Sequence, residues 1–154
     1  MSSELTAQNL IVTITEALSV DHANGETNDI DFAQTYTHTY AGVQHITKRI
    51  INLANTNRTV ILNFGTEESA GTVVRANVKY IRVTNLDGAQ NLSVGLEDAS
   101  TDCALTNVSP DSSIIFTNPV CEGTHGGSTL DNADTLVVKG GHNNHNLELF
   151  VATS

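Results

Sequence analysis

The histidines are the residues in this chain whose type and spacing come nearest to a chemical site. His142 and His145 stand three residues apart in the segment Gly140–His145, and His125 lies upstream. Two histidines at this spacing can bind a metal ion on one helix face. Here they fall in a Gly- and Asn-rich turn, where the spacing fixes no geometry, and no third ligand follows at a recognisable spacing. We interpret the segment as a polar hairpin loop and predict no metal site.

The remaining candidates for chemistry are weaker. His38 lies between Tyr36 and Tyr40 on one face of an alternating segment, where cross-strand packing is a better interpretation than metal binding. Pairs of carboxylates could serve acid–base work or bind calcium, but none has the Asp-x-Asp-x-Asp-Gly pattern of a calcium loop. We interpret them as solvated turn acids: Glu67 and Glu68, Glu97 and Asp98, and Asp29 and Asp31.

Nucleophilic catalysis requires a Ser or Cys held beside a base. The chain has no Gly-x-Ser-x-Gly elbow, and no phosphate-binding glycine motif opens a helix. Cys103 and Cys121 lie in no recognisable catalytic motif; they are either two free thiols or, if they flank neighbouring strands, a disulfide. We therefore predict no catalytic residue, no cofactor and no enzymatic activity.

The elements that would position these residues are predicted to be strands. Apolar and polar residues alternate with period two from end to end, and helix signals are thin even in segment 47–54, which is rich in β-branched residues. In segment 73–84 the apolar phase changes between Tyr80 and Ile81, which indicates a bulge or a strand buried on both faces. The other predicted strand positions are Leu10 to Ile14, Thr35 to Tyr40, 43–53, Val60 to Phe64, Leu92 to Leu96, Ala104 to Val108, Ile114 to Phe116, Leu136 to Val138 and Leu147 to Val151.

Turn signals separate these segments. Asp87-Gly88 predicts a hairpin that returns the chain into the strand at Leu92, and Pro110-Asp111 predicts a turn. The last two strands are expected to pair with each other. About nine or ten short strands at this spacing predict a single domain, residues 1–154, built as an antiparallel β-sandwich or a barrel. Segments 21–31 and 121–132 are predicted to be loops, and residues 1–9 to form an extended N-terminal arm.

The composition limits the partners. The net charge is −10, from seven Lys and Arg against 17 Asp and Glu, so the chain should repel nucleic acid and anionic membranes. Its apolar runs are too short to span a bilayer, and Met1–Glu4 has no basic start, so we predict no secretory signal and synthesis in a cytoplasm. Aromatic content is 5%, which leaves little for a carbohydrate or base-stacking platform.

From about residue 72 onward the chain has a characteristic order of strands and turns: Lys79–Asp87, Leu92–Leu96, Ser113–Phe116, Asp134–Lys139 and Leu147–Val151. In this order the second half of the chain resembles small virion proteins of tailed bacteriophages. The segment from Cys121 to Asp131 is an insertion relative to that pattern. The resemblance implies a jelly-roll-like β-sandwich that decorates phage heads, in the manner of the knob or cement proteins of marine and cyanobacterial phages.

On this resemblance the expected function is a non-enzymatic virion structural protein that docks on the major capsid protein. The expected location is the virion, after assembly in the host cytoplasm, and the protein could form a homo-oligomer. Two alternatives remain open. One is a tail, neck or fibre component with a role in adsorption, and the other is a lectin-like sandwich that binds a ligand. The segments expected to dock are residues 1–9 and the loops 21–31 and 121–132.

Overall fold

The computed structural model of the chain describes residues 7–20, 30–98, 105–117, 122–125, 128–131 and 133–154. These residues form thirteen strands and a single 3₁₀ turn, η1 (Arg75–Asn77), so the all-β prediction is confirmed, whereas about nine or ten strands were expected. The strands are β1 (Gln8–Val20), β2 (Ile30–Val43), β3 (His45–Leu53), β4 (Thr59–Gly65), β5 (Thr72–Val74), β6 (Val78–Asn85), β7 (Leu92–Glu97), β8 (Thr106–Val108), β9 (Ser113–Phe116), β10 (Glu122–His125), β11 (Ser128–Asp131), β12 (Thr135–Gly140) and β13 (His145–Thr153).

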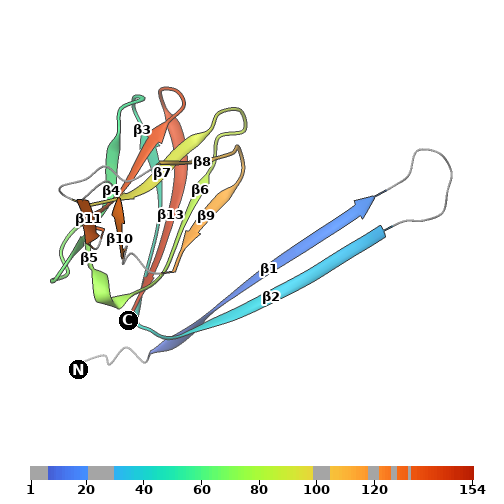
Figure 1. Ribbon diagram of the computed structural model, residues 1–154, viewed down its shortest axis with the longest axis horizontal. Helices are drawn as coiled ribbons and strands as arrows, with labels where there is room; N and C mark the ends of the chain where they lie inside the picture. Colours follow the sequence, from blue (N-terminus) through green and yellow to red (C-terminus); the bar gives the residue numbers. More distant parts are fainter. Residues whose placement is uncertain (1–6, 21–29, 99–104, 118–121, 126–127, 132) are drawn as a thin grey trace.

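Two sheets make up the body of the molecule, which is a β-sandwich (Figure 1). One sheet has the order β5-β4-β12-β7-β8 and the other the order β3-β13-β6-β9. All pairs are antiparallel except β4 with β5. The apolar side chains that alternate along the central strands of both sheets meet in one buried core: Ile81, Val83, Leu92, Val94, Leu136, Val138, Leu147 and Leu149. Burial of each such side chain contributes about 1.5–3 kcal/mol.

The strand pairing in the sandwich is nested. With the short strand β5 set aside, the first strand pairs with the last (β3 with β13), and the second pairs with the last but one (β4 with β12). Further in, β6 pairs with β9 and β7 with β8. Successive pairs fall in alternate sheets, so the turns after β6, β8 and β12 each carry the chain from one sheet to the other.

This nesting overturns two predicted hairpins. The Asp87-Gly88 turn does connect β6 to β7, but the two strands lie in different sheets and do not pair. In the same way β12 and β13 are not partners, although they are consecutive. Local turn chemistry predicts where a chain reverses, but the partner of each strand is decided by the core that both sheets share.

Two strand predictions are corrected by the burial of individual side chains. Alternation predicts that Val60 shares one face of its strand with Leu62 and Phe64, but Val60 is 48% exposed while Ile61 is buried. The cause is a register shift: Leu136 pairs with Leu62 and Val137 with Val60, so Ile61 is an extra residue in β4. The side chains before Ile61 therefore point to the opposite face from the one that alternation predicts. The segment 73–84 is not one strand, because η1 separates β5 from β6.

Two further strand pairs lie outside the sandwich. The strands β1 and β2 pair only with each other and project away from the sandwich as a long ribbon (Figure 1). The predicted loop 121–132 instead contains the strands β10 and β11, which form a second hairpin. Extended structure in the first nine residues is described only from Ala7 onward, and there it belongs to β1.

Candidate functional site

The hairpin of β1 and β2, called the arm from here on, has two different faces. Its antiparallel register places opposite one another the pairs Leu10 and Tyr40, Val12 and His38, and Ile14 and Tyr36. Because side chains alternate along a strand, these six residues share one face, here called the apolar face of the arm. The other face carries mainly threonines, including the opposed pairs Thr13 with Thr37 and Thr15 with Thr35.

The root of the arm is packed onto the outer face of the sheet β3-β13-β6-β9. Val43, Tyr80 and Ala152 form a small buried cluster there, against which Leu10 and Tyr40 pack. The rings of Tyr40 and Tyr80 lie 5.5 Å apart. Tyr80 and its neighbour Ile81 are therefore both buried, Tyr80 under the arm and Ile81 in the core between the sheets. This explains the change of apolar phase in β6 and confirms the alternative of a strand buried on both faces.

Beyond its root the apolar face of the arm is uncovered. Ile14 is 45% exposed and Tyr36 is 52% exposed. A hollow of about 540 Å³ separates this part of the arm from the outer face of the sheet, and it is lined from the sheet side by Tyr80, Ile115 and Thr117. Its size is within the range of pockets that accept several side chains of a partner or a small ligand.

The outer face of the sheet beyond the arm also mixes apolar and charged residues. Ile46 and Ile50 of β3 are 59% and 69% exposed. Between the strands, the carboxylate of Glu148 accepts ion pairs from Lys48 at 3.1 Å and Arg82 at 2.6 Å. The hydrogen bond from Lys48, opposed by burial and reinforced by Arg82, holds the pKa of Glu148 below its usual value.

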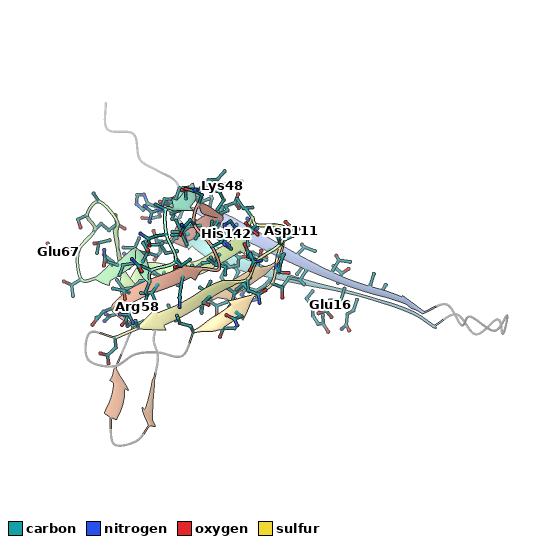
Figure 2. The ribbon with its side chains drawn as sticks, turned by 90° about the horizontal axis from the view of Figure 1, so that it is seen from above. Glu16, Lys48, Arg58, Glu67, Asp111 and His142 are labelled. Carbon is teal, nitrogen blue, oxygen red and sulfur yellow. The ribbon has the colours of Figure 1, made fainter. Side chains whose placement is uncertain are left out.

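The charge of the arm differs from that of the sandwich. Lys48 is the first basic residue of the chain, so all seven Lys and Arg lie outside the arm, which contains Glu16 and Asp31. Glu16 lies on the part of the arm that stands clear of the sandwich (Figure 2). A surface that binds the arm is therefore expected to be apolar with a neutral or basic rim.

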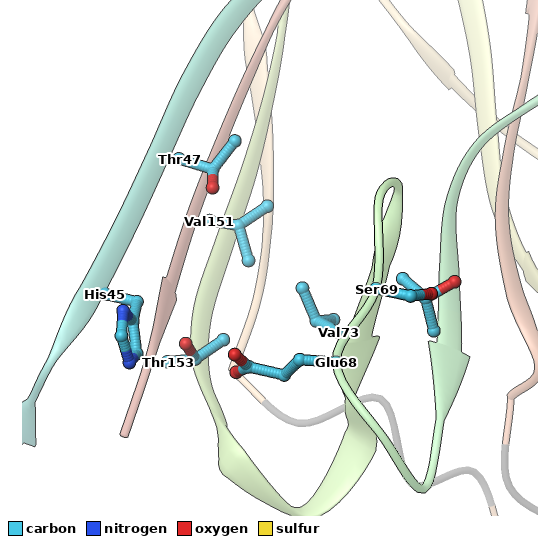
Figure 3. Close-up of a pocket in the computed structure, with 8 residues that line it drawn as sticks. His45, Thr47, Glu68, Ser69, Val73, Val151 and Thr153 are labelled. Atoms are coloured by element: carbon cyan, nitrogen blue, oxygen red, sulfur yellow. The ribbon is translucent and has the colours of Figure 1, made fainter.

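A smaller hollow of about 210 Å³ lies between the two sheets at one end of the sandwich (Figure 3). It is lined by His45, Glu68, Ser69 and Thr153, among others. This is below the usual range for sites of small organic ligands, and the described residues around it include no further histidine or carboxylate. We assign it no role.

The second constellation of polar residues sits where two connections between the sheets meet. Asp87 follows β6, and its Oδ1 atom accepts hydrogen bonds from the backbone N–H groups of Ala89 and Gln90 at 2.9 and 2.7 Å. Its Oδ2 atom lies 2.5 Å from Nε2 of His142, in the turn between β12 and β13. This hydrogen bond raises the pKa of His142 and lowers that of Asp87, which favours the protonated histidine and the ionised carboxylate.

His145, at the start of β13, completes the cluster from the buried side. Its ring lies 5.2 Å from that of His142, and one potential ligand atom from each of Asp87, His142 and His145 lies within 4.8 Å of the others. Nε2 of His145 is 2.8 Å from Oδ1 of the buried Asn85, whereas Nδ1 has no hydrogen-bond partner in the described part of the chain. Burial lowers the pKa of His145 and so favours its neutral form.

The sequence found two members of this cluster and missed the others. His142 and His145 were singled out by their spacing, but Asp87 is 55 residues before His142 and was interpreted only as a turn residue. Asn85 gave no signal, because nothing in the sequence marks an Asn for burial. A nested pairing, in which β6 and β13 become neighbours, would have been needed to place the two connections together.

The other sequence candidates are dispersed. His38 lies on the apolar face of the arm, opposite Val12 of β1, and its ring is 4.5 Å from that of Tyr40 on its own strand. Glu67 and Glu68 are exposed in the turn after β4 (Figure 2), and Glu97 is ion-paired with Arg58. Several candidates lie outside the described residues: Cys103, Cys121, Asp29 and the side chains of Asp31 and His125.

Comparisons with known proteins add no identification. No protein-family model matches the chain, and no curated protein or solved structure matches it. Among the described residues there is no helix of the length and hydropathy that crossing a membrane would require. The fold and the site therefore define the class only as a β-sandwich protein with a projecting hairpin arm.

Proposed function

We propose that this chain is a non-enzymatic structural protein of a bacteriophage virion. In this proposal it decorates the outer surface of the capsid and docks on the major capsid protein through the arm. The observation that carries the proposal is the uncovered apolar face of the arm, in which Ile14 and Tyr36 are about half exposed although they stand opposite each other. Exposed apolar surface of this kind marks contact with another protein.

The length of the arm supports a role in assembly. A strand of 13 residues extends about 40 Å, and a hairpin of two strands is at best marginally stable in water by itself. The root of the arm is fixed by Tyr40 and Val43, but its distal part has no sheet behind it. A neighbouring subunit that covers the apolar face would supply the missing layer.

The nested strand pairing supports the jelly-roll-like fold that the phage resemblance implies. In a jelly roll, eight strands are wound as two Greek keys into two sheets, an architecture common in viral capsid and lectin domains. Here the pairs β3–β13, β4–β12, β6–β9 and β7–β8 alternate between the sheets, as they would in a long hairpin rolled up on itself. The short strand β5 and the two outer hairpins are additions to that plan.

The charge distribution supports docking by the arm rather than by the sandwich. The arm contains no Lys or Arg, so a neutral or basic patch on the capsid would attract it, and copies of the acidic chain would repel one another before assembly. If charge pairs form the rim of the contact, retention on the capsid should weaken as salt rises.

The test is retention on heads assembled from the major capsid protein of the same phage. Wild-type chain and four variants are incubated with undecorated heads, which are then sedimented. Ile14→Asp and Tyr36→Asp place a charge on the apolar face and should each abolish retention. The matched controls Thr13→Asp and Thr37→Asp add the same charge to the opposite face of the same two strands and should bind like wild type.

Four outcomes would contradict the proposal in different ways. If wild-type chain is not retained, the capsid is not the partner. If all four variants are retained equally, another surface docks. A copy number of six to a few dozen per virion, rather than hundreds, would place the chain in the tail, neck or fibre, and specific binding on a glycan array would favour the lectin-like alternative.

A further inference from the structure

We propose that Asp87, His142 and His145 form a binding site for one divalent transition-metal ion, with Zn²⁺ as the best match. The site would join the connection that follows β6 to the turn between β12 and β13. It is separate from the arm, and the inference does not depend on how the chain docks. Its basis is the side-chain geometry of the cluster together with the hydrogen bonds that hold each ligand from behind.

The three side chains offer the donor set and the spacing that zinc requires. Two imidazoles and one carboxylate, with the remaining position open to water, are a frequent zinc set, and the bonds are about 2.0–2.2 Å long. Ligand atoms around such an ion are about 3.3 Å apart. In the structure one potential ligand atom of each residue lies within 4.8 Å of the others, with Oδ2 of Asp87 at 2.5 Å from Nε2 of His142. Side-chain movements of about 1–1.5 Å would bring these atoms to the spacing of zinc ligands.

The hydrogen bonds of Asn85 assign the tautomer of His145. Nδ2 of Asn85 lies within 3.1 Å of three backbone carbonyl oxygens, so it must be the donor end of the amide: these belong to Gln90, Val108 and Ser109. Its Oδ1 atom accepts from the N–H of Asp87 and faces Nε2 of His145. Nε2 of His145 therefore carries the proton, and its Nδ1 presents a lone pair.

That lone pair is the observation that points to a ligand. His145 is 0% exposed, and its Nδ1 atom has no hydrogen-bond donor among the described residues. A buried nitrogen without a partner costs about 1–3 kcal/mol, so such atoms call for an explanation. A metal ion at the cluster would satisfy it, because Nδ1 is the one nitrogen that His145 has free.

The other two ligands are held in the same manner. Nδ1 of His142 lies 2.6 Å from the backbone carbonyl oxygen of Asn143, to which it donates, and this leaves Nε2 to face the site. Oδ1 of Asp87 is occupied by two backbone N–H groups, which leaves Oδ2 to face the site. Metal-binding histidines usually donate their second N–H to a carbonyl or carboxylate, and here both histidines have such an acceptor.

The backbone around the cluster is shaped for this close approach. A Cβ atom at Gly140 would lie 2.8 Å from Cβ of His145, and one at Gly141 would lie 2.9 Å from the carbonyl oxygen of Asn91. Asn144 has a φ of 61°, in the left-handed region that Asn tolerates better than most residues. Gly140 thus lets the turn that carries His142 pack closely against His145, and Gly141 lets it approach the connection that carries Asp87.

The simpler reading is an ion pair of Asp87 with protonated His142, which needs no metal. It accounts for the short contact between them, but it leaves Nδ1 of His145 without a partner. The two interpretations also differ in which residues they require. Metal binding requires all three ligands, whereas the ion pair requires only two.

The test uses the full chain without an affinity tag, stripped with a chelator and then dialysed against micromolar Zn²⁺ alone. We expect one bound zinc per chain by elemental analysis. Asp87→Asn, which keeps the Oδ1 acceptor, and His142→Ala, at a half-exposed position, should each weaken zinc binding by at least about 10- to 100-fold, the loss typical when a hydrogen-bond partner of a metal ligand is removed. The matched control His45→Ala removes another exposed histidine and should leave the affinity unchanged. Nitrogen NMR shifts should assign the metal to Nε2 of His142 and Nδ1 of His145.

Absence of bound zinc at these concentrations would overturn the proposal, as would equal binding by wild type, Asp87→Asn and His142→Ala. Circular dichroism of each variant should match that of wild type, so that a loss of binding reports on the ligands. Retention on phage heads by a variant that has lost zinc would show that the metal site and the docking function are independent.

Discussion

The sandwich and the arm are built from the same kind of strand and differ in what covers them. In the sandwich, apolar side chains of β13 such as Leu149 meet a second sheet and are completely buried. In the arm, the same alternation ends in Ile14 and Tyr36, which face a hollow instead of a sheet. Alternation therefore specifies a strand with one apolar face. It does not specify what covers that face, which can be a second sheet of the same chain or a surface of another protein.

The largest difference between the two regions is expected on truncation of a core side chain. Leu149→Ala removes a fully buried side chain from a strand with a neighbour on each side, and the surrounding sheets cannot close the cavity. We expect a loss of about 3 kcal/mol in the free energy of unfolding, measured by urea denaturation. Ile14→Ala, on the arm, is the matched control. An equal loss in both variants would mean that the arm is as much a part of the folded core as β13.

The next effect concerns Asn85, one of the buried polar residues in the described part of the sandwich. Asn85 is 0% exposed, and its side chain bonds three carbonyl oxygens, one backbone N–H and the ring of His145. Asn85→Ala would leave those buried groups without partners, and we expect a loss of about 2 kcal/mol in the free energy of unfolding. The exposed Asn52, which bonds Asn146, is the control, and Asn52→Ala should cost less than about 0.5 kcal/mol. If Asn85→Ala leaves the free energy of unfolding unchanged, the hydrogen bonds of Asn85 to the connections around it do not stabilise the fold.

The sequence predicted the positions of strands better than it predicted which strands pair. The positions of most strands follow from local alternation, and the phase change between Tyr80 and Ile81 even recorded that β6 is covered on both faces. Pairing was not predictable in the same way. The Asp87-Gly88 turn is compatible with a hairpin and with an arch between sheets, and only long-range packing distinguishes them.

The candidate sites depended on that missing information. His142 and His145 were visible by spacing, but Asp87 joins them only because β6 and β13 are neighbours in one sheet. The strands of the arm, around Leu10 to Ile14 and Thr35 to Tyr40, were predicted by alternation, but not that they pair with each other outside the sandwich. The predicted extension of residues 1–9 falls mostly outside the described residues.

A smaller effect is expected on the outer face of the sheet beyond the arm, and it depends on pH. The pKa of Glu148 is lower in the folded protein than its ordinary value, so its ion pairs with Lys48 and Arg82 stabilise the fold above that ordinary value. This contribution is lost as the pH falls through the lowered pKa. At pH 7 the free energy of unfolding of wild type should exceed that of Glu148→Gln by about 1 kcal/mol or less, because the ion pairs are partly exposed, and the difference should vanish once the pH is below the lowered pKa.

The control for this titration is Glu67→Gln, in the exposed turn after β4. Its unfolding free energy should follow that of wild type at each pH. A Glu148→Gln variant that loses the same amount of stability at every pH would assign the role of Glu148 to packing and not to charge.

The smallest effect on stability should come from the arm itself. Ile14→Thr replaces an apolar side chain that is 45% exposed with one that suits a strand equally well, so the global free energy of unfolding should change by less than about 0.5 kcal/mol. Amide exchange should nevertheless be faster in the distal part of β1 than in β13, since the hydrogen bonds of the arm open without exposing the core. Addition of the partner that covers the apolar face should slow exchange in the arm and leave that of β13 unchanged. If the distal arm already exchanges as slowly as β13 in the isolated chain, its apolar face needs no partner, and the contrast between the two regions would not hold.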